Sequence, residues 1–224
     1  MADKPLVIIG NSEIAEMAHQ YFAYDSEREV AAFAIGRTYI KETELGGVPV
    51  VPLEELVRSH PPGAYDAFVA VGDGQLNRLR RRLLDEVKGQ GYALASYVSS
   101  AAFVWRNVEI GENCFILENN VLQPFTRIGD NVTLWSGNHI GHRTVVEDDV
   151  FMASHVVVSG FCRIGARSFV GVNASFAPHV AVAEDNFIGM GAVVTASTEA
   201  DGVYQGHPAE RRKISAKRYC RVSD

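Results

Sequence analysis

The sequence has few cysteines, no long hydrophobic run and no excess of positive charge. No stretch of 18 or more apolar residues occurs, and the first five residues lack the features of a secretory signal. We therefore expect a cytoplasmic protein without membrane insertion. The three cysteines, Cys114, Cys162 and Cys220, form no CxxC motif, which predicts reduced thiols. A formal net charge of −6 argues against binding to nucleic acid.

The chain of 224 residues, 47% of them hydrophobic, is long enough for two modest domains. A change of sequence pattern near residue 97 divides it. We predict an N-terminal domain over residues 1–97, a second domain over 98–199, and a C-terminal loop with a basic tail over 200–224.

Strand and helix patterns alternate in the first domain, which predicts a small Rossmann-like parallel sheet. Strands are expected at residues 5–9, 30–33, 48–51, 65–71 and 92–98, and helices after Ser12, after Pro52 and over 75–88. In such sheets the ligand crevice lies at the carboxyl ends of the strands. The first turn, Gly10, Asn11 and Ser12, and Gly72 after the fourth strand are therefore candidate nucleotide or sugar contacts, although only the first glycine of a GxGxxG loop is present.

A strict six-residue repeat begins at Val98 and continues to Val194. All 17 positions in this series are apolar, and the residue four places after each is small or medium and never charged. One bulky and one small inward position per hexad predict a narrow coil with flat walls. Glycine follows the bulky residue in six hexads, which we interpret as repeated tight corners: Gly111, Gly129, Gly141, Gly165, Gly171 and Gly189.

This second half resembles the hexapeptide-repeat acyltransferases, whose fold is a left-handed parallel β-helix with three hexads per turn. The fold class is thus expected to be a small α/β domain followed by an all-β β-helix. The whole chain, with Val-Ile-Ile-Gly-Asn-Ser-Glu at residues 7–13 and Trp-Ser-Gly-Asn-His-Ile-Gly-His at 135–142, resembles the sialic acid O-acetyltransferase and bacillosamine N-acetyltransferase family. That resemblance implies acetyl-CoA as the co-substrate and a homotrimer with active sites between neighbouring β-helices.

Histidines are the candidate catalytic residues, because acyl transfer from a thioester needs a base with a pKa near neutrality. His142 matches the position of the family's proposed base, and Gly160 matches a family glycine beside the pantetheine arm. The alternative role for His142 is a surface or trimer contact. Since Gly141 and Arg143 flank His142 where the family often has an acidic residue, an orienting carboxylate is expected from elsewhere, such as Glu118, Asp148 or the adjacent subunit.

The other candidate residues follow from the same resemblance. Phe151 stands where relatives have a histidine near the thioester, so His155 either replaces that histidine or is structural. Asn138, His139 and Phe151 are expected to line the acceptor groove. The expected CoA contacts are Gly160, Gly191, Ala192, Pro208, Arg211 and Lys213, although the basic residues also fit a solvated tail. No metal is expected, because Val157 and Gly160 stand one coil beyond His139 and His142 and cannot ligate.

The predicted function is acetyl transfer from acetyl-CoA to the amino group of a nucleotide-linked amino sugar, in the biosynthesis of a bacterial surface glycan such as lipopolysaccharide O-antigen. O-acetylation of a sugar hydroxyl is the first alternative. A trimeric β-helix without catalytic activity is an alternative of another class.

Overall fold

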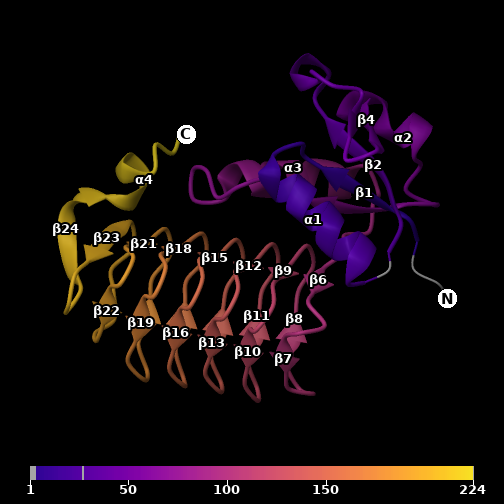
Figure 1. The fold of residues 1–224 in the computed structure, drawn as a ribbon. Helices are drawn as coiled ribbons and strands as arrows, with labels where there is room; N and C mark the ends of the chain where they lie inside the picture. Colours follow the sequence, from indigo (N-terminus) through magenta and orange to yellow (C-terminus); the bar gives the residue numbers. More distant parts are fainter. Residues whose placement is uncertain (1–3, 27, 224) are drawn as a thin grey trace. The chain divides into compact units, whose positions relative to one another are not determined.

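The computed structural model describes residues 4–26 and 28–223, which form two compact units (Figure 1). The first extends to Gly72 and also includes Leu79–Tyr97, and the second comprises Asp73–Arg78 and the chain from Val98 onward. A single boundary near residue 97 did not anticipate that residues 73–78 pack with the second unit. No helix of the described residues is long and apolar enough to cross a membrane.

The first unit is the predicted Rossmann-like sheet. Its strand order is β3-β4-β2-β1-β5, with all pairs parallel except β3 with β4. All four residues of β1 are buried, because helices and loops cover both faces of its sheet. The elements are β1 (Leu6–Ile9), α1 (Glu13–Tyr24), β2 (Val30–Ile35), η1 (Arg37–Tyr39), β3 (Glu44–Leu45), β4 (Val48–Pro52), η2 (Leu53–Glu55), α2 (Leu56–Ser59), β5 (Asp66–Val69) and α3 (Arg78–Gly89).

Three details of the described chain up to residue 98 differ from the sequence prediction. The hairpin partner β3 was not expected. The strand predicted over 92–98 is reduced to a single bridge between Ala67 and Leu94 and the two-residue strand β6 (Tyr97–Val98). The helix predicted from Gln75 begins at Arg78, because Gln75, Leu76 and Asn77 adopt left-handed backbone conformations with φ of 58°, 53° and 61°.

The second unit is the predicted left-handed β-helix, with two-residue strands at every hexad stacked into three parallel sheets (Figure 1). One sheet contains β7 (Phe103–Val104), β10 (Val121–Leu122), β13 (His139–Ile140), β16 (Val157–Val158), β19 (Ser175–Phe176) and β22 (Val193–Val194). The next contains β8 (Glu109–Ile110), β11 (Arg127–Ile128), β14 (Val145–Val146), β17 (Arg163–Ile164) and β20 (Ala181–Val182). The third begins with β6 and continues through β9 (Phe115–Ile116), β12 (Thr133–Leu134), β15 (Phe151–Met152), β18 (Phe169–Val170), β21 (Phe187–Ile188) and β23 (Gly202–Gln205).

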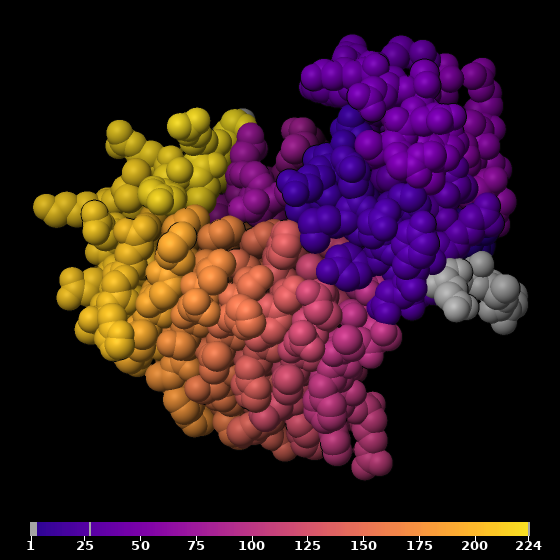
Figure 2. All heavy atoms as spheres, viewed as in Figure 1, coloured from indigo at the N-terminus to yellow at the C-terminus, as the bar shows by residue number. Residues whose placement is uncertain are grey.

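Each coil pairs with the coil 18 residues later, as in Val121 with His139 and Thr133 with Phe151. The second residue of every strand from β9 to β22 is the bulky hexad residue and is buried. These side chains and the small residues between them form one continuous core. Figure 2 shows successive coils of this unit in contact along its length. The hexad interpretation is therefore confirmed.

The glycines after the bulky residues have a different role from the one expected. None of the six has a positive φ; the left-handed corner position lies two residues later, as at Arg143 and Asn173. These glycines are needed because the next coil lies against them. A Cβ atom on Gly171 would lie 2.5 Å from the backbone nitrogen of Met190, and one on Gly141 would lie 2.6 Å from that of Gly160.

The C-terminal segment is more ordered than the loop and tail that we predicted. β23 forms an antiparallel hairpin with β24 (Glu210–Ser215), and α4 (Ala216–Tyr219) follows. The Ser215 side chain accepts a hydrogen bond from the Arg218 backbone and caps α4.

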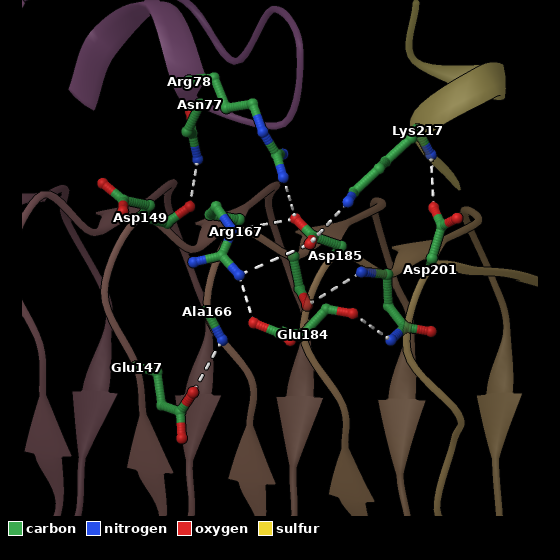
Figure 3. A network of polar contacts seen from close by, with 12 residues as sticks. Asn77, Arg78, Glu147, Asp149, Ala166, Arg167, Glu184, Asp185, Asp201 and Lys217 are labelled. Atoms are coloured by element: carbon green, nitrogen blue, oxygen red, sulfur yellow. Dashed lines mark hydrogen bonds and ion pairs between the residues drawn. The ribbon is translucent and has the colours of Figure 1, made fainter. Parts of the chain in front are cut away.

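A network of charged side chains holds residues 77–78 and α4 against one corner of the β-helix (Figure 3). Asp185, only 7% exposed, accepts hydrogen bonds from Arg167 Nε at 3.0 Å and from Arg78 Nη2 at 2.7 Å. Lys217 Nζ lies 3.8 Å from the same carboxylate. Although burial alone raises the pKa of Asp185, the bonds from Arg167 and Arg78 hold that pKa below its ordinary value.

This network predicts acid sensitivity of the second unit. A carboxylate with a lowered pKa in the folded state contributes stability above its ordinary pKa of 3.8, and this contribution is lost as the pH falls through the folded value. Asp185→Asn should therefore reduce the free energy of unfolding by about 1–3 kcal/mol at pH 7 and flatten its decline below about pH 5. Urea unfolding followed by tryptophan fluorescence measures this unit alone, since both tryptophans, Trp105 and Trp135, belong to it.

The exposed pair between Glu109 and Arg127 supplies the control, because both side chains are more than 60% exposed. Glu109→Gln should leave the free energy of unfolding unchanged at pH 7. An Asp185→Asn variant that loses stability in acid as steeply as the parent protein would contradict the assignment.

Candidate active site at a corner of the β-helix

His142 lies exposed at the corner that follows β13. Its backbone N–H donates a hydrogen bond to Gln123 Oε1 at 2.9 Å, and the same oxygen lies 3.3 Å from the imidazole Nδ1. Gln123 follows β10 on the preceding coil and is half-buried. The imidazole is therefore fixed from one side by a neutral amide.

Gly160 lies on the other side of the imidazole, one coil further along. A Cβ atom on Gly160 would lie 2.6 Å from His142 Cε1 and 2.9 Å from Nε2, so the ring rests against bare backbone. The pairing of His142 with Gly160, inferred from an 18-residue spacing, is thus present in the structure. The imidazole occupies the space that a side chain at residue 160 would fill.

Aromatic and cationic side chains continue along the same corner. The Phe161 ring meets the His142 ring edge-on at 5.0 Å, and His179 stacks on Phe161 at 5.0 Å. The Arg143 guanidinium lies 4.4 Å from the centre of the Phe125 ring. The Phe161 ring therefore separates His142 from His179.

His155 occupies a different corner of the β-helix. Its ring lies over Gly137, where a Cβ atom would be 2.7 Å from the His155 Nδ1. His155 has a φ of 60° and lies at the corner whose left-handed residues include Asn119 and Asn173. His142 lies just before Arg143, at the corner whose left-handed residues include Arg143 and Phe161. Within one chain the structure does not bring His142 and His155 together.

The three residues expected in an acceptor groove do not line one surface within the chain. His139 is half-buried on β13, next to Val157 of β16. Phe151 belongs to another sheet, where it stacks on Phe169 at 5.4 Å. Asn138 is fully buried, and its side chain donates to the Trp135 carbonyl at 2.5 Å and accepts from the Val156 backbone at 2.7 Å. Because Asn138 joins two coils from inside the β-helix, its side chain cannot line a surface groove.

Neither carboxylate suggested as a partner of His142 reaches it. Glu118 accepts a hydrogen bond from Ser136 Oγ at 2.6 Å, and Asp148 accepts one from the Asp130 backbone at 2.8 Å. Gln123 holds that position, and we did not identify it from the sequence. The signal was present, because Gln123 precedes His142 by one coil and one residue.

The expected CoA contacts lie near the end of the β-helix and on the hairpin after it. Gly191 is exposed with a φ of 65°, whereas Ala192 is fully buried and offers no side-chain contact. Pro208 is exposed in the β23–β24 turn, and Lys213 is exposed on β24. Arg211 on the same strand lies 3.5 Å from Glu199, so it is not a free cation.

In the first unit, the turn after β1 has the close approach that its glycine suggested. Gly10 has a φ of 130°, and a Cβ atom there would lie 2.5 Å from the Ala70 carbonyl oxygen. Ser12 occupies the N-cap position of α1, although its side chain makes no capping hydrogen bond. Asn11 lines a hollow of about 200 Å³ with Lys41 and several residues of α1 and the β3–β4 hairpin. Gly72 has open space beside it.

Two of the three cysteine thiols have a raised pKa. Burial raises the pKa of the Cys162 thiol, and burial together with Asp73 raises the pKa of Cys220 to about 11, so both are protonated at neutral pH. Among residues 4–26 and 28–223, no group of three or more histidine, cysteine or acidic side chains is placed to hold a metal ion.

Comparison with known proteins supports a transferase-type β-helix. Residues 107–140 and 125–160 match the family model described as bacterial transferase hexapeptide (six repeats). The chain is 39% identical over 100 residues to a UDP-3-O-acylglucosamine N-acyltransferase of Delftia acidovorans, covering 45% of this chain and 29% of that protein. The corresponding protein of Bordetella avium is 34% identical over 107 residues, covering 46% and 28%. The chain thus spans less than a third of the length of these relatives.

Solved structures match over nearly the whole chain. A variant of perosamine N-acetyltransferase from Caulobacter crescentus, in complex with CoA and GDP-perosamine, has a TM-score of 0.86 and 25% identity, and the match covers 94% of this chain and 98% of that one. The acetyltransferase domain of PglB from Neisseria gonorrhoeae, in complex with acetyl coenzyme A, has a TM-score of 0.85, 22% identity and coverage of 94% and 100%. At 22% identity, the match to the PglB domain shows a shared fold and nothing more.

Two glycine-to-alanine variants separate the site from the scaffold. Gly160→Ala places a methyl group against the His142 ring, which can rotate away, so the ring should be displaced with little loss of stability. Gly171→Ala places it against the backbone of Met190, which cannot move freely, and should cost about 1–3 kcal/mol. Urea unfolding measures stability, and NMR signals of the His142 side chain measure its displacement. The prediction fails if Gly160→Ala lowers the free energy of unfolding as much as Gly171→Ala does, or if Gly171→Ala shifts the His142 signals as much as Gly160→Ala does.

Proposed function

We propose that this left-handed β-helix protein transfers the acetyl group of acetyl-CoA to the amino group of a nucleotide-linked amino sugar. The observation that carries the proposal is the near-complete structural match to perosamine N-acetyltransferase, which was solved with CoA and GDP-perosamine. The exposed imidazole of His142 beside the bare backbone of Gly160 adds local support. Other features of the proposed complex follow from the chain's own residues.

The acetyl group must reach His142 on a narrow thioester arm, and we assign the backbone at Gly160, beside the exposed imidazole, to contact with that arm. We assign Gly191 and the main chain at Ala192 and Pro208 to contacts with the same co-substrate. Lys213 is exposed and can pair with a phosphate, while Arg211 would first have to leave Glu199. Gly10, Asn11, Ser12 and Gly72 are assigned to the nucleotide or sugar.

In addition to the acyl shift, the reaction moves one proton from the amine nitrogen to the sulfur of CoA. The amine nitrogen forms a bond to the acetyl carbon, the carbonyl oxygen becomes negative, and the collapse of this intermediate breaks the carbon–sulfur bond. His142 accepts the proton released by the amine and returns it to the departing thiolate of CoA. His155 and the ring of Phe151 are assigned to the acetyl or acceptor side, with His139 shaping the groove.

A homotrimer would place residues from different corners of neighbouring chains in one site. Within one chain His142 and His155 lie at different corners, so a site that uses both needs a second β-helix. Aromatic residues such as Phe125 and Phe161, which are 53% and 47% exposed, offer apolar contact area for it. We further propose that the protein acts in the cytoplasm, in the biosynthesis of a surface glycan such as lipopolysaccharide O-antigen.

O-acetylation of a sugar hydroxyl is the second candidate reaction, because a histidine base also serves that chemistry. A non-catalytic trimeric scaffold is the remaining alternative. It predicts no thermal stabilisation by acetyl-CoA, whereas an enzyme that binds this molecule is stabilised by it.

A mass-spectrometric screen of nucleotide-linked amino sugars with acetyl-CoA tests donor, acceptor and bond type together. We expect a product 42 mass units heavier than one of the amino sugars, 42 being about the mass that an acetyl group adds when it replaces hydrogen. His142→Ala should lower kcat about 10- to 100-fold with an amine acceptor, and at least about 1,000-fold with a hydroxyl acceptor. His60→Ala, in the first unit, is the control. Full activity of His142→Ala would remove this residue from the mechanism.

The oligomeric state is tested by light scattering at micromolar concentration. The expected mass is three times that of the 24.5 kDa chain. A monomer would contradict both the homotrimer and a site shared between chains.

A further inference from the structure

We infer that Gln123 is a positioning residue that holds the His142 imidazole in the tautomer with the proton on Nδ1, leaving Nε2 bare as the proton acceptor. This inference rests on the proposed role of His142 as the base. It deepens that role by naming the group that orients the ring, which here is an uncharged amide.

The backbone N–H of His142 fixes the orientation of the Gln123 amide, because this group can only donate a hydrogen bond. The oxygen and nitrogen of an amide side chain are usually hard to distinguish, but a backbone N–H can only donate. The His142 backbone N–H points at the side-chain atom 2.9 Å away, so that atom must be the oxygen, Oε1. A flipped Gln123 would place two donors against each other.

The tautomer of His142 follows from the same oxygen. Oε1 lies 3.3 Å from Nδ1 and has no proton to give, so a hydrogen bond between them requires the proton on Nδ1. In the neutral ring, Nε2 then carries the free lone pair. A base with this tautomer accepts a proton at Nε2, the nitrogen farther from the backbone.

Both sides of this contact are fixed by the stacking of coils. The Gln123 backbone N–H bonds to the Ile140 carbonyl at 3.0 Å, and its own carbonyl accepts from the buried Thr126 hydroxyl at 2.7 Å. On the next coil, Gly160 and the edge of the Phe161 ring confine the imidazole. The ring therefore cannot turn away from Gln123 without leaving the space above Gly160.

No carboxylate of the described chain forms a hydrogen bond or ion pair with His142. Arg143, the next residue, holds its guanidinium over Phe125, and His179 lies beyond the Phe161 ring. An amide orients the ring but places no negative charge beside it. This suits an amine acceptor, whose proton becomes acidic once nitrogen has bonded to the acetyl carbon, better than a hydroxyl acceptor.

The first test is the tautomer itself, measured on the full chain with ¹⁵N-labelled histidine. Protonated and bare ring nitrogens have well separated ¹⁵N resonances, and the His142 signals are assigned by their loss in His142→Asn. At a pH where the ring is neutral, Nδ1 should be protonated and Nε2 bare. Gln123→Met, which keeps the length of the side chain but removes the acceptor, should give a mixture of tautomers, whereas Gln123→Glu should keep the parent tautomer.

Glu147 offers a matched control. Glu147 Oε2 accepts a hydrogen bond from the Ala166 backbone N–H at 2.9 Å. This bond spans 19 residues, like the bond between Gln123 and the His142 backbone, but it lies at a corner without histidine. Glu147→Met removes an equivalent link between coils, together with the ion pair between Glu147 and Arg163, and should leave the His142 resonances unchanged. If it alters them as much as Gln123→Met does, the effect of Gln123 is merely structural.

The second test is kinetic and uses the same variants with acetyl-CoA and an amino sugar. Gln123→Met should lower kcat less than His142→Ala does, by about 3- to 10-fold, because part of the tautomer mixture stays active, with little change in the KM for acetyl-CoA. Gln123→Glu should retain activity and move the acid limb of the pH profile to higher pH, since a carboxylate stabilises the protonated ring.

The two tests separate the inference from the proposed function. Wild-type protein with the proton on Nε2, or a Gln123→Met variant with the parent tautomer, overturns the positioning role whether or not the protein transfers acetyl groups. The expected tautomers with no product from any amino sugar leave Gln123 as the orienting group and overturn the proposed function alone.

Discussion

Every feature of the second unit depends on the parallel register that places each residue against the one 18 positions later. A hydrogen bond between coils is made only if the coils lie at strand spacing, and a side chain at the wrong position prevents this. The cost is visible at Gly141 and Gly171, where even one methyl group would enter the backbone of the next coil. The same close approach creates the imidazole position of His142, which lies over Gly160 because residue 160 has no side chain. Scaffold and candidate site therefore arise from one constraint.

The β-helix was predictable because its period is short and its core positions are unambiguous. Seventeen apolar residues in steps of six have no other simple explanation, and the strands indeed end on them. The role of the glycines was not predictable in the same way. Tight corners and close packing both favour glycine, and only coordinates show that the left-handed positions are taken by residues such as Asn173 and Arg143. Composition indicates that a glycine is needed but does not say which steric conflict it avoids.

The segment predicted as a helix over residues 75–88 shows where local patterns fail. The apolar residues of 75–88 fit one helix, yet Gln75, Leu76 and Asn77 leave the helical conformation. Leu76 instead joins a cluster with Val203 and Ala216, and Asn77 donates to the Asp149 carbonyl at 2.6 Å. Three residues in a left-handed conformation cost roughly 1–2 kcal/mol each, so burial of Leu76 and the bonds of Asn77 and Arg78 must offset that cost. A contact with residues more than 70 positions away decides the local structure, and no window of sequence contains it.

The candidate site was partly predictable for the same reason that the scaffold was. An 18-residue step from His142 finds Gly160, but its partner Gln123 lies 19 residues away, because a side chain at the end of one strand bonds to the backbone after the corresponding strand of the next coil. Glu147 and Ala166 repeat this geometry without histidine. The side-chain oxygen of Gln123 thus links two coils through the backbone of residue 142. Because residue 142 is a histidine, the same oxygen also lies beside Nδ1 and selects the tautomer of the ring. In a β-helix, an orienting group for a base can come from a bond that the fold already requires, so a search for charged neighbours in sequence will miss it.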